Sequence, residues 1–330
     1  MNFRTKSLAE LLMMSIFAAF GGLTSASAQS VSQSVLIQGI SSLTPGNTSS
    51  PFAGNVTLGS AGPQFYTVLS LGGQGNNSDN ITHTNVTFNN QSTIQGNVGV
   101  PAVGNLSTSG NAFINGTLFL NTAGSWSHSG TSGAANFQQN AATDAQLNQA
   151  VQDALNASQQ AAALPSTQPS ITNINLGDHG MMTINGTGKD VINLTNFVLG
   201  NQATLTLNAP AGDSFIFNIS GNFSDQGLVL LTGGITPDDV LFNVTGTGSA
   251  VQFSGGGNQA QLNGILLAPF RDIQLSPGLV TGEIIGGGNI LTLTSGADAV
   301  PEASTTMLLI TGTVFFGAVV FCRRKEALQS

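Results

Sequence analysis

The residues that could carry out chemistry in this chain of 330 residues are few and widely separated. Its three histidines, His83, His128 and His179, lie in different polar stretches, and none stands at the spacing of a metal-binding motif such as H-E-x-x-H. The single cysteine, Cys322, lies in an apolar run near the end of the chain, so the rest has no thiolate for a structural zinc. We therefore predict surface positions for the histidines, no metal centre and no bound cofactor.

Motifs for acyl, phosphoryl or glycosyl transfer are also missing. There is no G-x-S-x-G nucleophile elbow, and the stretch GTGKD at residues 186–190 has neither the upstream glycine nor the Ser or Thr of a phosphate-binding loop. Enzymes that cleave polysaccharides need clustered acids, or a basic residue beside carboxylates that bind calcium. The body of the chain offers one adjacent acid pair, Asp238-Asp239, and two basic residues, Lys189 and Arg271. We predict that the protein is not an enzyme, and a polysaccharide-active β-helix enzyme is the second alternative.

The N-terminus carries the pattern of a secretory signal. Two basic residues precede an apolar run over residues 11–23, and Ala26 and Ala28 then provide the small-x-small pattern that signal peptidase cleaves. The sequence therefore predicts a signal peptide over residues 1–28 and export of the chain that follows. An N-terminal membrane anchor that is never cleaved is the alternative.

The C-terminus is typical of a membrane anchor. Residues 306–322 carry no charge, and they are followed directly by Arg323, Arg324 and Lys325. An apolar span with a basic flank is typical of a stop-transfer helix whose basic end stays in the cytoplasm. We predict a transmembrane helix over residues 306–322, with the body of the chain on the exported side.

The body between these two signals is anionic. Five of the seven Lys and Arg residues lie in the end signals, whereas acidic residues are scattered throughout the body. Such a surface cannot neutralise phosphate groups, so nucleic acid is excluded as a partner. The body also has no cysteine, so its stability has to come from packing and backbone hydrogen bonds rather than from disulfides.

Short runs that alternate apolar and polar side chains recur along the body, which predicts a mainly β fold. Some runs also repeat: IQGNV at residues 94–98 and INGTL at 114–118 lie twenty residues apart, and LNGIL at 262–266 and VTGEI at 280–284 lie eighteen apart. Repeats at such intervals favour the coils of a β-solenoid, in which glycine forms the corner and the apolar residues fill the interior.

One segment breaks this pattern and predicts a helix. Leu147 and Val151 lie four residues apart in a stripe that alanines complete, and Pro165 marks the end. At the start, Thr143 has a Gln three residues later, which is the spacing of a capping box. A helix over residues 144–163 would be about 30 Å long, enough to lie along several coils. The predicted fold is therefore a β-solenoid with one long α-helix packed alongside.

The end of the chain resembles the PEP-CTERM sorting signal of Gram-negative bacteria. The resemblance covers residues 299–330, with a short motif at 300–305, the apolar span and the basic tail at 323–325. Ala303 stands where a second proline is usual, and the positions that match the motif are Val300, Pro301, Glu302, Ser304 and Thr305. The resemblance implies processing by an exosortase, a membrane enzyme, after a transient stay in the inner membrane.

The body, which we assign to residues 58–298 after an N-terminal strand and linker at 29–57, is similar to the choice-of-anchor A family of exported bacterial domains. Three stretches carry this resemblance: DDVLFNVTGTG at residues 238–248, LNGILLAPFRDIQL at 262–275 and GEIIGGGNI at 282–290. The aromatic-proline stretch usual before the second of them is absent. The order of strands and helix also resembles the ice-binding-like domain, which implies a solenoid fold more firmly than it implies a ligand.

These observations favour a non-catalytic structural or adhesion protein. We expect it to be exported and located at the outer surface or in the extracellular matrix of a Gram-negative bacterium. Signal peptidase and the exosortase are the expected partners during processing. Extracellular polysaccharide or other matrix proteins are the expected partners afterwards.

Ice binding is the first alternative function. A solenoid can present a flat face, and ATLTLN at residues 203–208 and ILTLTSG at 290–296 offer pairs of outward threonines with leucines turned inward. We expect the coils between them to present a mixed column of Asn218 and Ser220, Asn243 and Thr245, and Gln252 and Ser254. Unequal side chains in one column would spoil flatness, which predicts an ordinary solvated sheet.

Overall fold

The computed structural model describes residues 51–73, 85–102, 104–246, 248–255, 260–288 and 290–301. The predicted signal peptide, the linker up to residue 50 and the sorting signal beyond Pro301 lie outside these ranges. Within the described ranges, no helix is both long enough and apolar enough to cross a membrane.

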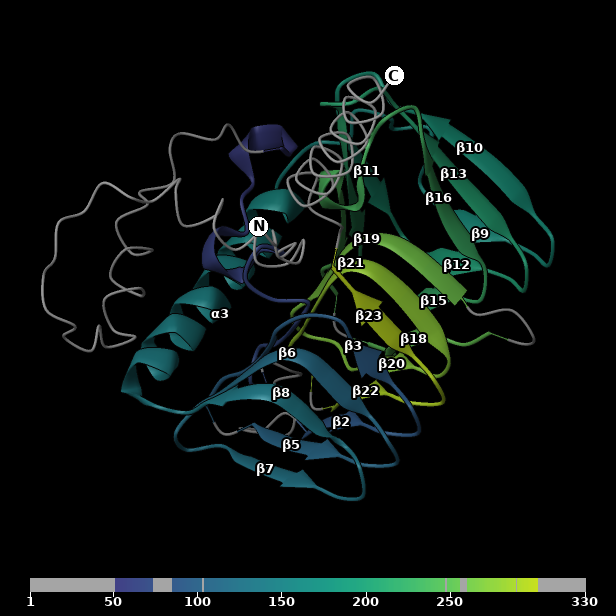
Figure 1. Ribbon diagram of the computed structural model, residues 1–330. Coiled ribbons are helices and arrows are strands. Elements are labelled where there is room, and N and C mark those ends of the chain that lie inside the picture. Colours follow the sequence, from purple (N-terminus) through teal and green to yellow (C-terminus); the bar gives the residue numbers. More distant parts are fainter. Residues whose placement is uncertain are drawn as a thin grey trace, which may run out of the picture. The chain divides into compact units, whose positions relative to one another are not determined.

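Parallel strands stacked into coils form the body of the protein, and they belong to one sheet of 14 strands and one of nine (Figure 1). The side chains that point inward are mostly apolar, and the apolar ones make one continuous core. The mainly β solenoid predicted from the sequence is therefore confirmed. The nine-stranded sheet contains, in spatial order, β7 (Ser125–His128), β5 (Asn105–Thr108), β2 (Asn85–Phe88), β22 (Ile290–Leu293), β20 (Ile273–Leu275), β18 (Val251–Phe253), β15 (Phe223–Asp225), β12 (Phe197–Leu199) and β9 (Ile174–Leu176).

The 14-stranded sheet bends around a corner and forms two faces. The first, which we call the long face, contains β8 (Gly133–Gln138), β6 (Phe113–Leu120), β3 (Thr93–Ile94), β23 (Asp298–Val300), β21 (Gly278–Gly286), β19 (Ala260–Ala268), β16 (Leu228–Thr232), β13 (Thr204–Asn208) and β10 (Met181–Asn185). The second, which we call the helix face, is formed by the far halves of β19 and β21 together with β11 (Lys189–Leu194), β14 (Ser214–Ile219), β17 (Val240–Val244), β1 (Val68–Ser70) and β4 (Val98–Val100).

Glycine forms the corner between these two faces, as the sequence predicted. Gly264 and Gly282 stand side by side in β19 and β21 and have φ angles of 151° and 130°. Residues with a side chain rarely adopt such angles. A Cβ atom on Gly282 would also stand 2.4 Å from the carbonyl oxygen of Gly264, so the corner has no room for one.

The repeats read from the sequence are neighbouring coils. Ile94 pairs with Ile114, and Leu262 pairs with Val280 in the next coil. The path of the chain is not a simple spiral, however. The strands from β1 to β8 wind toward one end, the helix follows, and the strands from β9 onward wind back until β22 lies between β20 and β2. The first and last strands of the chain therefore meet in the middle of the sheets.

The long helix α3 (Ala141–Ala162) is present close to the predicted range of 144–163. It begins three residues earlier because Asn140 is the N-cap, with its side-chain oxygen accepting hydrogen bonds from the N–H groups of Ala142 and Thr143 at 3.0 Å each. The capping position predicted at Thr143 is therefore wrong, and Thr143 is buried inside the first turn. Leu147 and the alanines of its stripe are buried in a second core with side chains of the helix face.

Asparagines of the helix face bond directly to α3. Asn193, Asn218 and Asn243 occupy one row on three neighbouring strands. Asn218 donates to the side-chain oxygen of Asn193 at 2.9 Å, and Asn243 donates to that of Asn218 at 2.8 Å. Each also donates to a carbonyl near the end of the helix, at Leu164, Ala161 and Ser158 respectively. This asparagine ladder satisfies carbonyl groups at a helix end that has few partners of its own.

The described end of the predicted linker, residues 51–57, contains the short 3-10 helix η1 (Ala53–Asn55), and η2 (Gly59–Ala61) follows it. Both contact α3. Ser60 donates from its N–H and its hydroxyl to one carboxylate oxygen of Asp153 at 2.8 and 2.7 Å. The segment that precedes the first strand therefore lies beside the helix, and η1 also contacts β11 and β14 of the helix face.

Candidate functional site

The nine-stranded sheet has an outer surface that no described element covers. In the strands between the two ends of this sheet, the side chains before and after the central outward position are turned into the core, as with Val86 and Phe88 on either side of Thr87. The strand pairings place the central outward residues in a single row that crosses the whole sheet. This row consists of Ser127, Ser107, Thr87, Thr292, Gln274, Gln252, Ser224, Val198 and Asn175.

One half of this surface is uniform. On the four neighbouring strands β22, β2, β5 and β7, every central residue is a threonine or a serine, and a second row lies two residues further along. We call these eight residues the hydroxyl grid, in which seven side chains carry a hydroxyl group and the eighth, Asn89, carries an amide: Thr292 and Thr294, Thr87 and Asn89, Ser107 and Ser109, Ser127 and Ser129. Backbone hydrogen bonds continue between strands at the second row, for example from Ser109 to Phe88, so both rows share the same spacing. None of the eight side chains is charged.

The other half of the same surface is uneven. Gln274 and Gln252 follow Thr292 in the central row, and beyond them the row ends with Ser224, Val198 and Asn175. The two glutamines are longer than serine or threonine and have more rotatable bonds, so they interrupt the row of short side chains.

The outer surface of the long face differs in size and polarity. Large apolar side chains are exposed there, with Met181 81% and Leu230 40% accessible to solvent, and Asp298 adds a charge. Thr204 and Thr206 of β13 lie on this face, whereas Thr292 and Thr294 belong to the hydroxyl grid.

The mixed column predicted from the sequence is therefore wrong. Its members do not share a face: Gln252 lies on the nine-stranded sheet, while Asn218 and Asn243 lie beneath α3 in the asparagine ladder. The alternation itself is confirmed, since Leu205 and Leu207 are buried while Thr204 and Thr206 face outward. Because these residues belong to separate faces, they give no reason to expect an uneven surface on any one of them.

The other residues that the sequence singled out are dispersed. His128 and His179 are exposed, as predicted, and His83 lies outside the described residues. Among the described residues, no group of three His, Cys, Asp or Glu side chains could hold a metal. Val300 ends β23, and Pro301 follows it. The other residues assigned to the two processing signals lie outside the described ranges: Ala26, Ala28, Glu302, Ser304, Thr305, Arg323, Arg324 and Lys325.

Arg271 has a structural role that the sequence did not reveal. Its side chain is only 2% exposed, and its guanidinium donates to the carbonyl oxygens of Gly246, Ser249, Ser220 and Gly221. Burial lowers its pKa. These carbonyls belong to the turns before β15 and β18, and Arg271 itself precedes β20. The guanidinium therefore fixes three successive turns at the edge of the nine-stranded sheet.

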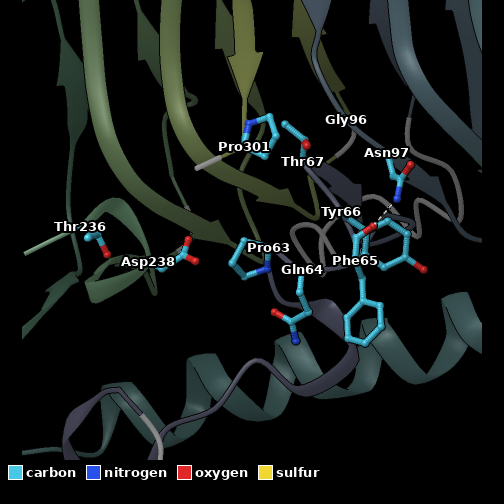
Figure 2. Close-up of a pocket in the computed structure, with 10 residues that line it drawn as sticks. All are labelled: Pro63, Gln64, Phe65, Tyr66, Thr67, Gly96, Asn97, Thr236, Asp238 and Pro301. Carbon is cyan, nitrogen blue, oxygen red and sulfur yellow. Dashed lines mark hydrogen bonds between the residues drawn. The ribbon is translucent and has the colours of Figure 1, made fainter. Parts of the chain in front are cut away.

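A pocket of about 590 Å³ lies on another side of the molecule (Figure 2). Its walls come from residues 63–67, Gly96 and Asn97, the 3-10 helix η3 (Pro237–Asp239) with the preceding Thr236, and Pro301. In η3, Asp239 caps the turn, with its carboxylate accepting from the N–H and hydroxyl of Thr236 at 2.9 and 2.8 Å. The two acids that are adjacent in the sequence therefore have different positions: Asp239 caps the turn, and Asp238 lines the pocket.

Two acidic side chains are completely enclosed in the described part of the solenoid, and neither was identified from the sequence. Asp225 is 0% exposed, accepts one hydrogen bond from the N–H of Gly227 at 2.8 Å, and has a pKa raised by burial to about 8. Glu283 is also 0% exposed, and burial, followed by the nearby Asp238, raises its pKa well above the usual range. Both acids face surroundings that favour a neutral side chain.

The fold defines a class of protein: a parallel β-solenoid in which a long helix covers one face and an uncharged sheet stays open. Residues 80–297 match the ice-binding-like family, and the protein belongs to this family. Of the resemblances noted in the sequence, the one to the ice-binding-like domain is thus confirmed. Family membership places the chain among non-catalytic proteins, in agreement with the prediction that it is not an enzyme.

Several solved structures of ice-binding proteins are similar to this chain. An ice-binding protein from an Antarctic biological consortium is 20% identical, with a TM-score of 0.46, 74% of this chain covered and 90% of the other. The ice-binding protein LeIBP from an Arctic yeast is 17% identical, with a TM-score of 0.48 and coverage of 75% and 94%. The ice-binding protein domain from Shewanella frigidimarina is 17% identical, with a TM-score of 0.42 and coverage of 75% and 97%. A search of curated proteins found no match.

Proposed function

We propose that the protein binds ice through the outer surface of the nine-stranded sheet. The observation that supports this function most directly is the hydroxyl grid, because it places short uncharged side chains in two rows on four neighbouring strands. Membership of the ice-binding-like family agrees with it.

The grid has the geometry that ice adsorption needs. An ice surface presents water molecules at fixed spacings, so a protein surface that binds it should present its groups at fixed spacings too. Neighbouring strands stand about 4.8 Å apart, and side chains on one side of a strand recur roughly every 6.8 Å, so the grid is a two-dimensional lattice. Hydroxyl groups both donate and accept hydrogen bonds, which allows them to hold water molecules in either orientation.

The grid is also rigid before any ligand arrives. Apolar side chains fill the solenoid directly beneath it, with Phe88, Leu106 and Leu293 all at most 1% exposed. A surface that is already ordered does not lose conformational entropy on binding, so many weak contacts with water can add up. The large exposed side chains of the long face lack this regularity, and we assign no ice contact to them.

The test compares one substitution on each face. Thr87 lies on β2, in the middle of the hydroxyl grid, and Thr204 lies on the long face. We expect the purified protein to show thermal hysteresis and to inhibit ice recrystallisation. The bulky ring in Thr87→Tyr should remove most of this activity, while Thr204→Tyr should leave it at the wild-type level.

Circular dichroism and thermal unfolding of both variants serve as the control for folding. The proposal fails if the wild-type protein is no more active than an inert protein. It also fails if Thr87→Tyr keeps full activity while folded.

A role at the cell surface is the second candidate, and the two terminal signals in the sequence favour it. We infer that the chain is exported, is held in the inner membrane by residues 306–322 and is then processed by an exosortase at the PEP-CTERM motif. Adhesion to extracellular polysaccharide or to matrix proteins would follow from such a location. Fractionation of cells that carry the full chain or a chain without residues 300–330 tests this location. An unchanged distribution after the deletion would contradict it.

A glycan array separates adhesion from ice binding. Retained sugar binding in Thr87→Tyr would place adhesion on another surface. Loss of both activities would assign them to the hydroxyl grid. No binding to any glycan would contradict polysaccharide as the partner.

A further inference from the structure

One end of the solenoid stops at two edge strands. The last coil there contributes β7 to the nine-stranded sheet and β8 to the 14-stranded sheet, and each of these strands pairs on one side only, β7 with β5 and β8 with β6. Figure 1 shows them at the lower end of the stack, with no described strand beyond them. Every residue of both strands is exposed or half-buried. We call the surface formed by Ser125–His128 and Gly133–Gln138 the open end.

Aromatic side chains stand at the open end, in rows that belong to the core in the neighbouring coil. Trp126 pairs with Leu106, which is buried, and Phe137 pairs with Leu118, which is buried too. The ring of Trp126 lies 5.4 Å from that of Phe137 and 5.0 Å from that of His128. Because no described coil follows, Phe137 is 46% exposed and His128 is also exposed. The core therefore ends in an aromatic cluster that is open to solvent.

The open end lacks the charges, prolines and covering segment with which native proteins often protect an edge strand. Such protection is needed because the unpaired N–H and C=O groups of an edge otherwise pair with another chain. Neither β7 nor β8 contains a proline, and residues 85–143 include no Asp, Glu, Lys or Arg at all. Among the described residues, no segment runs along the free side of either strand.

The opposite end, formed by β9, β10 and β11, is protected at β11. Residues 164–168 run along this strand: the N–H of Thr167 donates to the carbonyl of Val191 at 2.8 Å, and the N–H of Val191 donates to the hydroxyl of Thr167 at 3.0 Å. The covering segment contains Pro165, and β11 itself begins with the charged Lys189. The chain thus covers an edge at one end of the solenoid and leaves the other end uncovered.

We propose that the open end is an interface between two copies of this chain, in which β7 of each copy pairs with β7 of the other in antiparallel orientation. A row of N–H and C=O groups is matched by another strand edge, and a second copy supplies an identical one. In a two-fold interface each residue lies near its own copy, so charged residues would repel one another, whereas an uncharged end is complementary to itself. Aromatic residues such as Trp126 and Phe137 are typical of the buried centre of an interface.

The aromatic cluster fits a protein partner better than a sugar. A sugar ring stacks on a flat aromatic surface, but the ring planes of Trp126 and Phe137 are inclined by 36°, and those of Trp126 and His128 by 40°. The Nε1 atom of Trp126 already donates to the hydroxyl of Thr108 at 3.1 Å, so it is not available to a sugar hydroxyl.

The interface would also enlarge the hydroxyl grid, a consequence that rests on the proposed ice binding. Ser127 of β7 and Ser129 directly after it are the last residues of the grid at this end. Pairing about a two-fold axis perpendicular to the nine-stranded sheet would place both grids on the same side, with the two β7 strands about 4.8 Å apart. The four grid strands of each copy would then form one surface.

Analytical ultracentrifugation of the purified protein measures the association without ice. Over about a hundredfold range of concentration, the wild-type protein should approach twice the mass of one chain. Phe137→Lys places a charge in the interface twice, once from each copy, so it should raise the Kd of the dimer by about a hundredfold or more. The matched control is Met181→Lys, which changes an apolar side chain on β10 that is 81% exposed and should leave the Kd unchanged.

If Phe137→Lys does not fold, Asn136→Lys at the neighbouring exposed position of β8 takes its place. A wild-type protein that stays monomeric overturns the proposal, and so does a dimer that the folded β8 variant leaves intact. A monomer that binds glycans, with loss of binding in Trp126→Ala, would assign the aromatic cluster to a sugar and overturn the interface too. A monomer that still inhibits ice recrystallisation contradicts the interface alone, whereas a dimer without ice activity supports the interface and contradicts ice binding.

Discussion

The helix face and the outer surface of the nine-stranded sheet both carry regular rows of uncharged polar residues, but these rows have different partners. On the helix face, the asparagine ladder is buried and its amide groups bond to carbonyls of α3. In the hydroxyl grid, Ser107, Thr87 and Thr292 have no covering element among the described residues and meet water. A regular polar row on a solenoid is therefore a candidate for ligand binding only on the face that the chain leaves open. In this protein α3 covers the asparagine ladder, whereas no described element covers the hydroxyl grid.

Raising the pH should destabilise the solenoid through an acid that lies inside it rather than on its open surface. Asp225 is buried on the inner side of the nine-stranded sheet, and its pKa is raised to about 8 from about 4 in the unfolded chain. The folded state therefore holds a proton that the unfolded state releases, so stability should fall as the pH rises from 4 to 8. The loss attributable to this group is on the order of 5 kcal/mol.

Urea unfolding across this pH range measures that effect. Asp225→Asn should make the dependence less steep and leave the part that the buried Glu283, whose pKa is also raised, contributes. Asp178→Asn, which changes an exposed acid, serves as the control. An equally steep pH dependence in Asp225→Asn would show that Asp225 is not the group responsible.

Removing a ladder asparagine should destabilise the helix face strongly. Asn243→Ala deletes three hydrogen bonds, to the carbonyl and hydroxyl of Ser158 and to Asn218, and leaves their buried partners unsatisfied. The expected loss is about 3 kcal/mol in the free energy of unfolding, measured with urea. The matched control is Asn175→Ala, in the exposed row of the nine-stranded sheet, which should change stability by less than about 0.5 kcal/mol. Similar losses for both asparagines would remove the distinction between the two faces.

Extending the hydroxyl grid should change stability less than the other substitutions, and it should increase ice-binding activity. Gln252 and Gln274 interrupt the central row, and threonine at both positions would carry the row of short hydroxyl side chains across seven strands, from β7 to β15. Threonine also suits an exposed strand position, so stability should change by less than about 0.5 kcal/mol. We expect Gln252→Thr/Gln274→Thr to raise thermal hysteresis above the wild type, and Gln261→Thr on the long face to leave it unchanged. A decrease in the double variant would argue against a continuous row as the binding surface.

Much of the fold could be predicted from the sequence, but the candidate site could not. The alternation of side chains indicates strands, and the repeat that aligns Leu262 with Val280 indicates coils, because both depend on residues close together in the chain. Which face a strand joins depends on the lengths of the corners before it, and these vary from coil to coil. Thr204 and Thr292 occupy similar local patterns and yet lie on different faces.

Buried charges were missed for a related reason. Nothing local separates Glu283 or Asp225 from a surface acid, since each is enclosed by segments far away in the sequence. Arg271 offered one available signal, as one of only two basic residues in the body, but its four carbonyl partners lie in turns that only the folded coils bring together.

The meeting of the first and last strands in the middle of the sheets has a consequence for how the protein folds. Asn85 pairs with Ile290, and Thr93 pairs with Asp298, so the contacts that close both sheets join the two ends of the domain. Long-range contacts of this kind have a high entropic cost and form slowly. The solenoid therefore cannot be completed on the ribosome before its last strand, β23, has emerged. Until that moment the central strands have unpaired edges. A delay in folding is compatible with export, because we expect the chain to cross a membrane before it folds.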